Sequence, residues 1–86
     1  MSESTFTTRF YASLEEYLSQ AVAASRNGDL RGAQKLGHKM LGICQMFGTA
    51  EQIALCEIVE NIQSLSKLTH TLELLHSQIQ SDKQRS

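Results

Sequence analysis

Apolar residues recur along this chain at intervals of three and four, the spacing that places them on one face of an α-helix. Four segments show the pattern, and we predict helices over about residues 6–25, 30–47 and 50–65 and from Leu68 onward. The positions expected to face a core are, segment by segment, Phe10, Leu14, Tyr17, Ala21 and Ala24; Ala33, Leu36, Met40, Ile43 and Phe47; Leu55, Ile58, Val59, Ile62 and Leu65; and Leu68, Leu72, Leu75 and Ile79. Residues 1–5 are expected to form a disordered leader and residues 81–86 a polar tail.

Short polar turns separate these segments. Gly28 suits the left-handed end of the first helix, and Asp29 suits the N-cap of the second. Gly48 ends the second helix, and Thr49 with Gln52 predicts a capping box on the third. Because short connections make neighbouring helices antiparallel, we predict an all-α fold, an antiparallel up-down four-helix bundle over residues 6–80.

Composition and charge narrow the classes of partner. The 86 residues suffice for one domain, with 41% hydrophobic residues, no proline and only 6% aromatic residues, which favours helices. A net charge of −1 gives no large positive field for nucleic acid or an anionic membrane. The longest uncharged stretch, residues 40–50, is too short to cross a membrane. We expect a cytoplasmic domain that binds neither nucleic acid nor membrane.

Most kinds of catalytic site lack their motif. The sequence has no phosphate-binding glycine loop, no G-x-S-x-G, no H-E-x-x-H and no C-x-x-C. Its three histidines do not pair at i, i+4, so we expect no metal site. Cys44 and Cys56 lie on or beside the apolar stripes, where a free thiol packs as a small hydrophobic group, and we favour that interpretation over a redox role.

His38 stands apart from the apolar stripe of its helix. At about 100° per residue it points roughly 170° away from the middle of that stripe, toward solvent. The residues on its face are Arg31, Gln34, Lys35, Leu41, Gly42 and Gln45. Gly42 costs an exposed helix roughly 1 kcal/mol relative to alanine, which suggests that open space beside the ring is useful. Arg31 and Lys35 could neutralise a phosphoryl group, but the geometry fits an ordinary surface histidine equally well.

The stretch H38-K-M-L-G42-I-C-Q-M-F-G48, followed by A-L-C56-E57-I-V-E60, resembles the histidine-containing phosphotransfer (HPt) domain of multistep two-component phosphorelays. The family pattern is H-x-L-K-G with a second glycine six residues later, on the second of four bundle helices. His38, Met40, Gly42 and Gly48 match it in register, and the likeness extends over about residues 6–80.

The resemblance implies a phosphoryl carrier rather than an enzyme. His38 would accept a phosphoryl group from the aspartate of a receiver domain and pass it to another receiver domain. Glu60, 22 positions later, matches the family residue that holds the ring through Nδ1 and leaves Nε2 as the nucleophile. The chain would bind no cofactor of its own, because the Mg²⁺ would sit on the receiver partner. The implied partners are response-regulator receiver domains or a hybrid sensor histidine kinase.

Leu41 replaces the family's lysine and leaves an alternative open. We expect Lys35, Lys39 or Arg31 to supply the missing charge, and Leu41 with Gly42 to form an exposed apolar rim for docking. The alternative is a degenerate HPt-like module that binds a receiver without phosphotransfer. A weaker third hypothesis is self-association through the seam formed by Leu68, Leu72, Leu75 and Ile79, although we expect a monomer.

Overall fold

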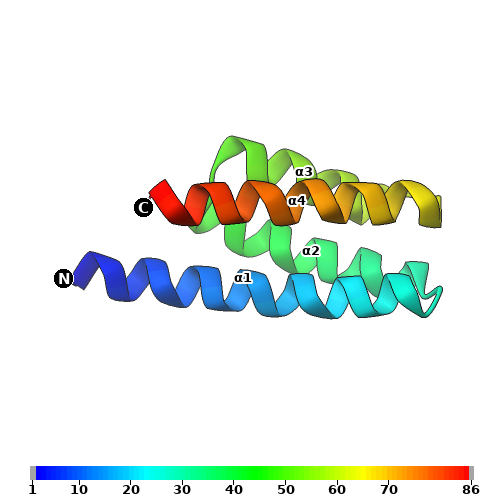
Figure 1. The fold of residues 1–86 in the computed structure, drawn as a ribbon, viewed down its shortest axis with the longest axis horizontal. Coiled ribbons are helices and arrows are strands. Elements are labelled where there is room, and N and C mark those ends of the chain that lie inside the picture. The colour runs from blue at the N-terminus through cyan, green and yellow to red at the C-terminus, as the bar shows by residue number, and fades with distance from the viewer. Residues whose placement is uncertain (1, 86) are drawn as a thin grey trace.

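The computed structural model describes residues 2–85, which form four α-helices: α1 (Ser2–Arg26), α2 (Leu30–Phe47), α3 (Ala50–Asn61) and α4 (Leu65–Arg85). Each helix packs against the next one in the chain, and α1 also packs against α4 (Figure 1). The predicted all-α four-helix bundle is therefore confirmed. Figure 1 shows α3 as the short member of the bundle, beside the long α4.

The predicted turn residues close the helices as expected. Gly28 has φ +73°, the left-handed conformation that glycine adopts without steric cost. Asp29 caps α2 by accepting a hydrogen bond of 2.9 Å from the backbone N–H of Gly32. Thr49 and Gln52 form the capping box on α3, with both hydrogen bonds at 3.1 Å.

Both end helices are longer than the sequence pattern predicted. Helix α1 begins at Ser2, so residues 2–5 are helical rather than a disordered leader, and Met1 lies outside the described residues. Helix α4 continues to Arg85, which makes residues 81–85 helical as well, and Ser86 lies outside the described range. Side chains of this last stretch are anchored: Asp82 accepts a hydrogen bond of 2.8 Å from Gln52, and Lys83 lies 3.2 Å from Glu15.

The break between α3 and α4 falls earlier than the predicted end at residue 65. Helix α3 ends at Asn61, and Ile62 leaves it in an extended conformation with φ −72° and ψ 142°. The carbonyl oxygen of Ser64 then accepts a 2.9 Å hydrogen bond from the N–H of Leu68, in the first turn of α4. The early end places Glu60 in the last turn of α3.

The buried face of α2 is rotated relative to the predicted one, although Ala33 and Met40 are buried as expected. Its buried residues are Ala33, Gly37, Met40, Leu41 and Cys44. Phe47, which we expected inside, is 53% exposed, and Leu36 and Ile43 are only half-buried. At about 100° per residue, the buried sector is rotated by roughly 70° toward Leu41. Ile58 and Leu65 are likewise exposed, whereas all four predicted positions of α4 are buried.

Two polar side chains among the described residues are buried, those of Gln52 and Thr71. Gln52 is fully buried, and its Nε2 atom donates to Asp82 at 2.8 Å and to the Tyr11 hydroxyl at 3.5 Å. Its Oε1 atom accepts the Thr49 N–H. Among the described side chains, every buried nitrogen and oxygen atom has a hydrogen-bond partner. None of the four helices, over residues 2–85, is long and apolar enough to span a membrane.

Candidate functional site

The imidazole of His38 projects from α2 into solvent and contacts one carboxylate. Its Nδ1 atom lies 2.5 Å from Oε2 of Glu60, on α3. The His38 side chain is 73% exposed, whereas the Glu60 side chain is only 30% exposed. An ionised carboxylate can only accept a hydrogen bond, so Nδ1 carries the proton of the neutral ring. Nε2 then keeps its lone pair, and it makes no hydrogen bond with any described residue. The expected contact between His38 and Glu60 is therefore present.

Gly37 explains how α3 comes close enough for this contact. A β-carbon at this position would lie 2.7 Å from Cγ1 of Val59 and 2.9 Å from the backbone nitrogen of Glu60. Both distances are shorter than van der Waals contact, so only glycine lets the two helices approach this closely. The apolar pattern of the sequence did not single out Gly37. The available signal was a second helix-interior glycine beside the histidine, at a cost of roughly 1 kcal/mol relative to alanine.

Gly42 has the opposite environment, because a β-carbon there would meet no atom within 4 Å. The residue is exposed and lies one turn after His38 on the same helix. The open space that the sequence predicted beside the ring is therefore present.

The predicted basic residues do not all surround the imidazole. Arg31 and Lys35 are exposed on the His38 face of α2, at i−7 and i−3, and neither forms an ion pair with another described residue. Lys39 is turned toward α1, where its Nζ atom lies 5.8 Å from the ring centroid of Tyr17. Arg31 and Lys35 are thus the cations still available to an anion at His38.

The two glutamines near His38 differ in environment. Gln34 donates a hydrogen bond of 2.6 Å from Nε2 to the carbonyl oxygen of Ile62, at the C-terminal cap of α3. Its amide is therefore engaged in holding two helices together. Gln45 is exposed and makes no hydrogen bond with the rest of the described chain. Of the two, Gln45 alone has an amide available to a partner.

Leu41 does not form the exposed apolar rim that we expected beside His38. It is only 9% exposed and belongs to the core cluster. The physical reason is the rotation of α2, which turns the Leu41 side of the helix inward. Exposed apolar side chains lie further along the same helix, at Met46 (72% exposed) and Phe47. The ring centroid of Phe47 lies 5.7 Å from that of Phe6 in α1.

The two cysteines are packed inside the bundle, as expected for small hydrophobic groups. Their Sγ atoms are 4.0 Å apart across α2 and α3. The hydrogen bond to Cys44, together with burial, raises the pKa of the Cys56 thiol well above its ordinary value. No group of three histidine, cysteine or acidic side chains within residues 2–85 could hold a metal ion.

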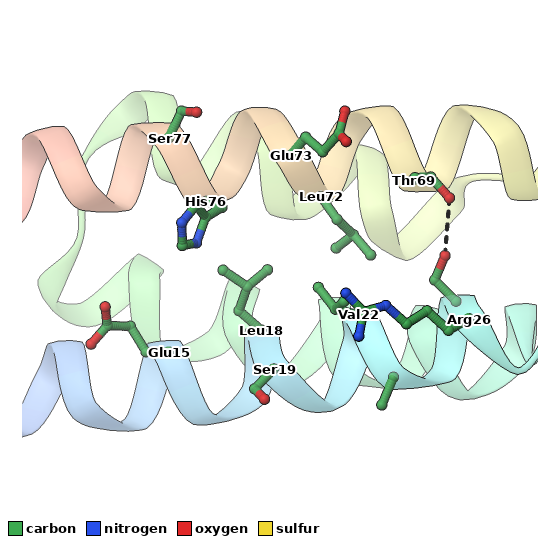
Figure 2. Close-up of a pocket in the computed structure, with 12 residues that line it drawn as sticks. Glu15, Leu18, Ser19, Val22, Arg26, Thr69, Leu72, Glu73, His76 and Ser77 are labelled. Carbon is green, nitrogen blue, oxygen red and sulfur yellow. Dashed lines mark hydrogen bonds between the residues drawn. The ribbon is translucent and has the colours of Figure 1, made fainter.

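A groove between α1 and α4 contains another histidine, His76 (Figure 2). Leu18, Val22 and Leu72 are apolar residues in its lining, and a 3.1 Å hydrogen bond between Ser25 and Thr69 crosses it. His38 and Glu60 do not line this groove. The predicted seam for self-association is buried within the single chain: Leu68, Leu72, Leu75 and Ile79 belong to the core.

The candidate site therefore consists of His38, Glu60 and Gly42, with Arg31 and Lys35 on the same exposed face. The structure removes Leu41 from this surface and directs Gln34 and Lys39 to structural contacts. Comparisons with models of protein families, with curated protein sequences and with solved structures found no match.

Proposed function

We propose that the chain is a histidine phosphotransfer module. His38 accepts a phosphoryl group from a receiver-domain aspartate and passes it to the aspartate of another receiver domain. The observation that supports this most directly is the contact between His38 and Glu60. Through this contact the proton of the neutral ring is held on Nδ1, and Nε2 is left open to an approaching phosphorus atom. The His38 side chain is 73% exposed.

The chemistry is a displacement at phosphorus. The Nε2 lone pair of His38 forms the new N–P bond while the P–O bond to the aspartyl group breaks, and that carboxylate leaves with the bonding electrons. The ring gains positive charge as the bond forms, and the Glu60 carboxylate stabilises it through the Nδ1–H hydrogen bond. Transfer to the second aspartate is the reverse displacement, so the same contact serves both steps.

The surroundings of His38 suit the charge of the transferred group. In phosphoryl transfer, negative charge spreads over three equatorial oxygens, which require cationic partners. Arg31 and Lys35 supply positive charge on this chain, and the Mg²⁺ of the receiver supplies the rest. The chain brings no nucleotide-binding motif, so its role is that of a carrier rather than a kinase. Gly42 leaves the approach to the ring open.

A receiver domain must also dock beside His38 before transfer. With Leu41 buried, the exposed apolar side chain of α2 that lies closest in direction to His38 is that of Met46, eight residues further along and about 80° around the helix. Methionine suits a surface that accepts more than one partner, because its side chain is flexible and polarisable. Met46 therefore replaces Leu41 as the apolar part of the proposed docking surface, whereas Phe47 points about 180° away from His38 and packs against Phe6 on α1.

The test is transfer of labelled phosphoryl from a phosphorylated receiver domain to the full chain. We expect a label that acid removes and base does not, which is the signature of phosphohistidine. His38→Gln should abolish labelling without changing the helical circular dichroism, because exposed substitutions move stability by less than about 0.5 kcal/mol. His70→Gln and His76→Gln are matched controls at other exposed histidines and should keep the label. Label that persists in His38→Gln would reject the proposal.

One observation favours a second function, a degenerate module that binds a receiver without exchanging phosphate. Leu41 provides no charge where the family pattern has lysine, and its burial keeps that position away from the phosphoryl group. Titration with an unphosphorylated receiver, combined with the labelling assay, separates the two functions. A wild-type chain that binds the receiver but accepts no label would favour the degenerate module.

A further inference from the structure

We propose that Gln34 and Gly37 are positioning residues that select the tautomer of His38 by holding the last turn of α3 against α2. They lie one turn before His38 and directly before it on α2. Their contacts with α3 are made at both sides of Glu60. The consequence for phosphoryl transfer rests on the proposed function, but the effect on the tautomer does not.

The three contacts form one continuous interface between the helices. Gly37 lies against Val59 and the backbone nitrogen of Glu60. His38 reaches the Glu60 carboxylate, and Gln34 donates to the carbonyl oxygen of Ile62, two residues further on, at 2.6 Å. The end of α3 and its C-terminal cap are thus held by backbone proximity at Val59 and Glu60, by the imidazole at Glu60 and by a side-chain amide at Ile62.

The end of α3 depends on such support. The helix has only 12 residues, a length at which an isolated helix is marginal in water. No glycine ends it, and the N–H of Ile62 reaches Val59 only through a long 3.5 Å hydrogen bond. Because carbonyl groups of a last turn have no partner within their own helix, the Gln34 amide stabilises the turn that carries Glu60.

The position of Glu60 decides which ring nitrogen of His38 carries the proton. The hydrogen bond that one nitrogen makes selects the tautomer, and Nδ1–H is selected here by the carboxylate. If the last turn of α3 frays or moves away, this selection is lost. The proton then shifts toward Nε2, and the lone pair needed for attack on phosphorus is no longer available.

The test uses two variants and a matched control for each. Gln34→Met keeps the length of the side chain but removes the amide donor, and Gln45→Met makes the same change at an exposed position without a hydrogen bond. Gly37→Ala places a β-carbon against Glu60, whereas Gly42→Ala places one in open space. The tautomer is read from long-range ¹H–¹⁵N correlations of the imidazole, in ¹⁵N-labelled full-length chain at a pH where the ring is neutral.

We expect Nδ1–H as the major tautomer in the wild type and in both controls, and a shift of at least twofold in the tautomer ratio toward Nε2–H in Gln34→Met and Gly37→Ala. The phosphoryl transfer rate should fall with it, while receiver affinity stays the same. If Gly37→Ala does not fold, Gln34→Met decides alone. An unchanged tautomer in folded Gln34→Met would overturn the inference. If the tautomer shifts in Gln34→Met but the wild-type chain accepts no phosphoryl label, the inference is supported and only the proposed function is rejected.

Discussion

Replacing Leu41 by lysine tests the rotation of α2 directly. Restoring the family's lysine would be a surface change if Leu41 faced solvent, but the side chain is only 9% exposed. Full burial of a leucine side chain contributes about 1.5–3 kcal/mol. Lysine can keep part of the contact by burying its methylene groups while its ammonium reaches water. We therefore expect Leu41→Lys to lower the free energy of unfolding by about 2 kcal/mol.

The assay is urea denaturation followed by circular dichroism, with a thermal scan beside it. For a chain of this size, a loss of about 2 kcal/mol corresponds to a fall in Tm of about 8–16 °C. Leu41→Met should lose less than about 1.5 kcal/mol, because it conserves volume and hydrophobicity. Gln45→Lys adds the same charge to an exposed position of α2 and should change stability by at most about 0.5 kcal/mol.

Equal urea midpoints for Leu41→Lys and Gln45→Lys would refute the burial of Leu41 and the rotation of α2 with it.

The Leu41→Lys variant also tests the role of charge in phosphoryl transfer. Because Arg31 and Lys35 already carry positive charge on the His38 face, and position 41 is turned toward the core, a lysine there should change the transfer rate by no more than about fivefold, which is ~1 kcal/mol. A wild type without label and a labelled Leu41→Lys would favour the degenerate module.

Three further changes probe the site and the bundle. Gly42→Gln should slow phosphoryl transfer at least tenfold while the fold stays intact, because its side chain fills the open space beside the ring. Gly42→Ala should raise the free energy of unfolding by up to about 1 kcal/mol. Equal transfer rates in the two variants would show that access to the ring does not matter. Glu60→Ala should lower the transfer rate by about tenfold, equal to ~1.4 kcal/mol, without abolishing it, and an unchanged rate would leave Glu60 as an ordinary surface carboxylate. A third change concerns Glu15, whose pKa lies below its ordinary 4.5. Burial alone would raise this pKa, but hydrogen bonds from Gln80 and Lys83 lower it, as do the positive charges of Lys83 and His76, and these effects outweigh burial. The ionised carboxylate therefore stabilises the fold above pH 4.5, and this stabilisation is lost as the pH falls through the lowered pKa. As the pH falls below 4.5, the urea midpoint of Glu15→Gln should decline less steeply than that of the wild type.

The turns could be predicted from the sequence because their causes are local. Gly28, Asp29 and Thr49 cap helices through contacts with residues only a few positions away, and their structures match the expectation. The open space at Gly42 followed from one helix alone for the same reason. The place of Glu60 opposite His38 came from the family resemblance, and the contact is present.

The face of α2 that is buried could not be predicted in the same way. A stripe of large apolar residues favoured Leu36, Ile43 and Phe47, but α3 packs against small residues of α2, Gly37 and Cys44. Close approach of two backbones contributes more contact than a larger side chain that holds the helices apart. Which face of α2 is buried therefore depends on the shape of α3, and the apolar periodicity of α2 carries no information about that shape.

The buried amide of Gln52 also fixes the axial register of the bundle. Its hydrogen bonds join the start of α3 to Tyr11 on α1 and to Asp82 near the end of α4. Apolar contacts tolerate sliding of one helix along another, since any leucine can replace its neighbour in a groove. A slide of one turn, about 5.4 Å, would leave the Nε2 group of this amide buried without Asp82 and Tyr11, at a cost of roughly 1–3 kcal/mol. Gln52 thus sets the height of α3 in the bundle, and with it the level at which Glu60 meets the imidazole.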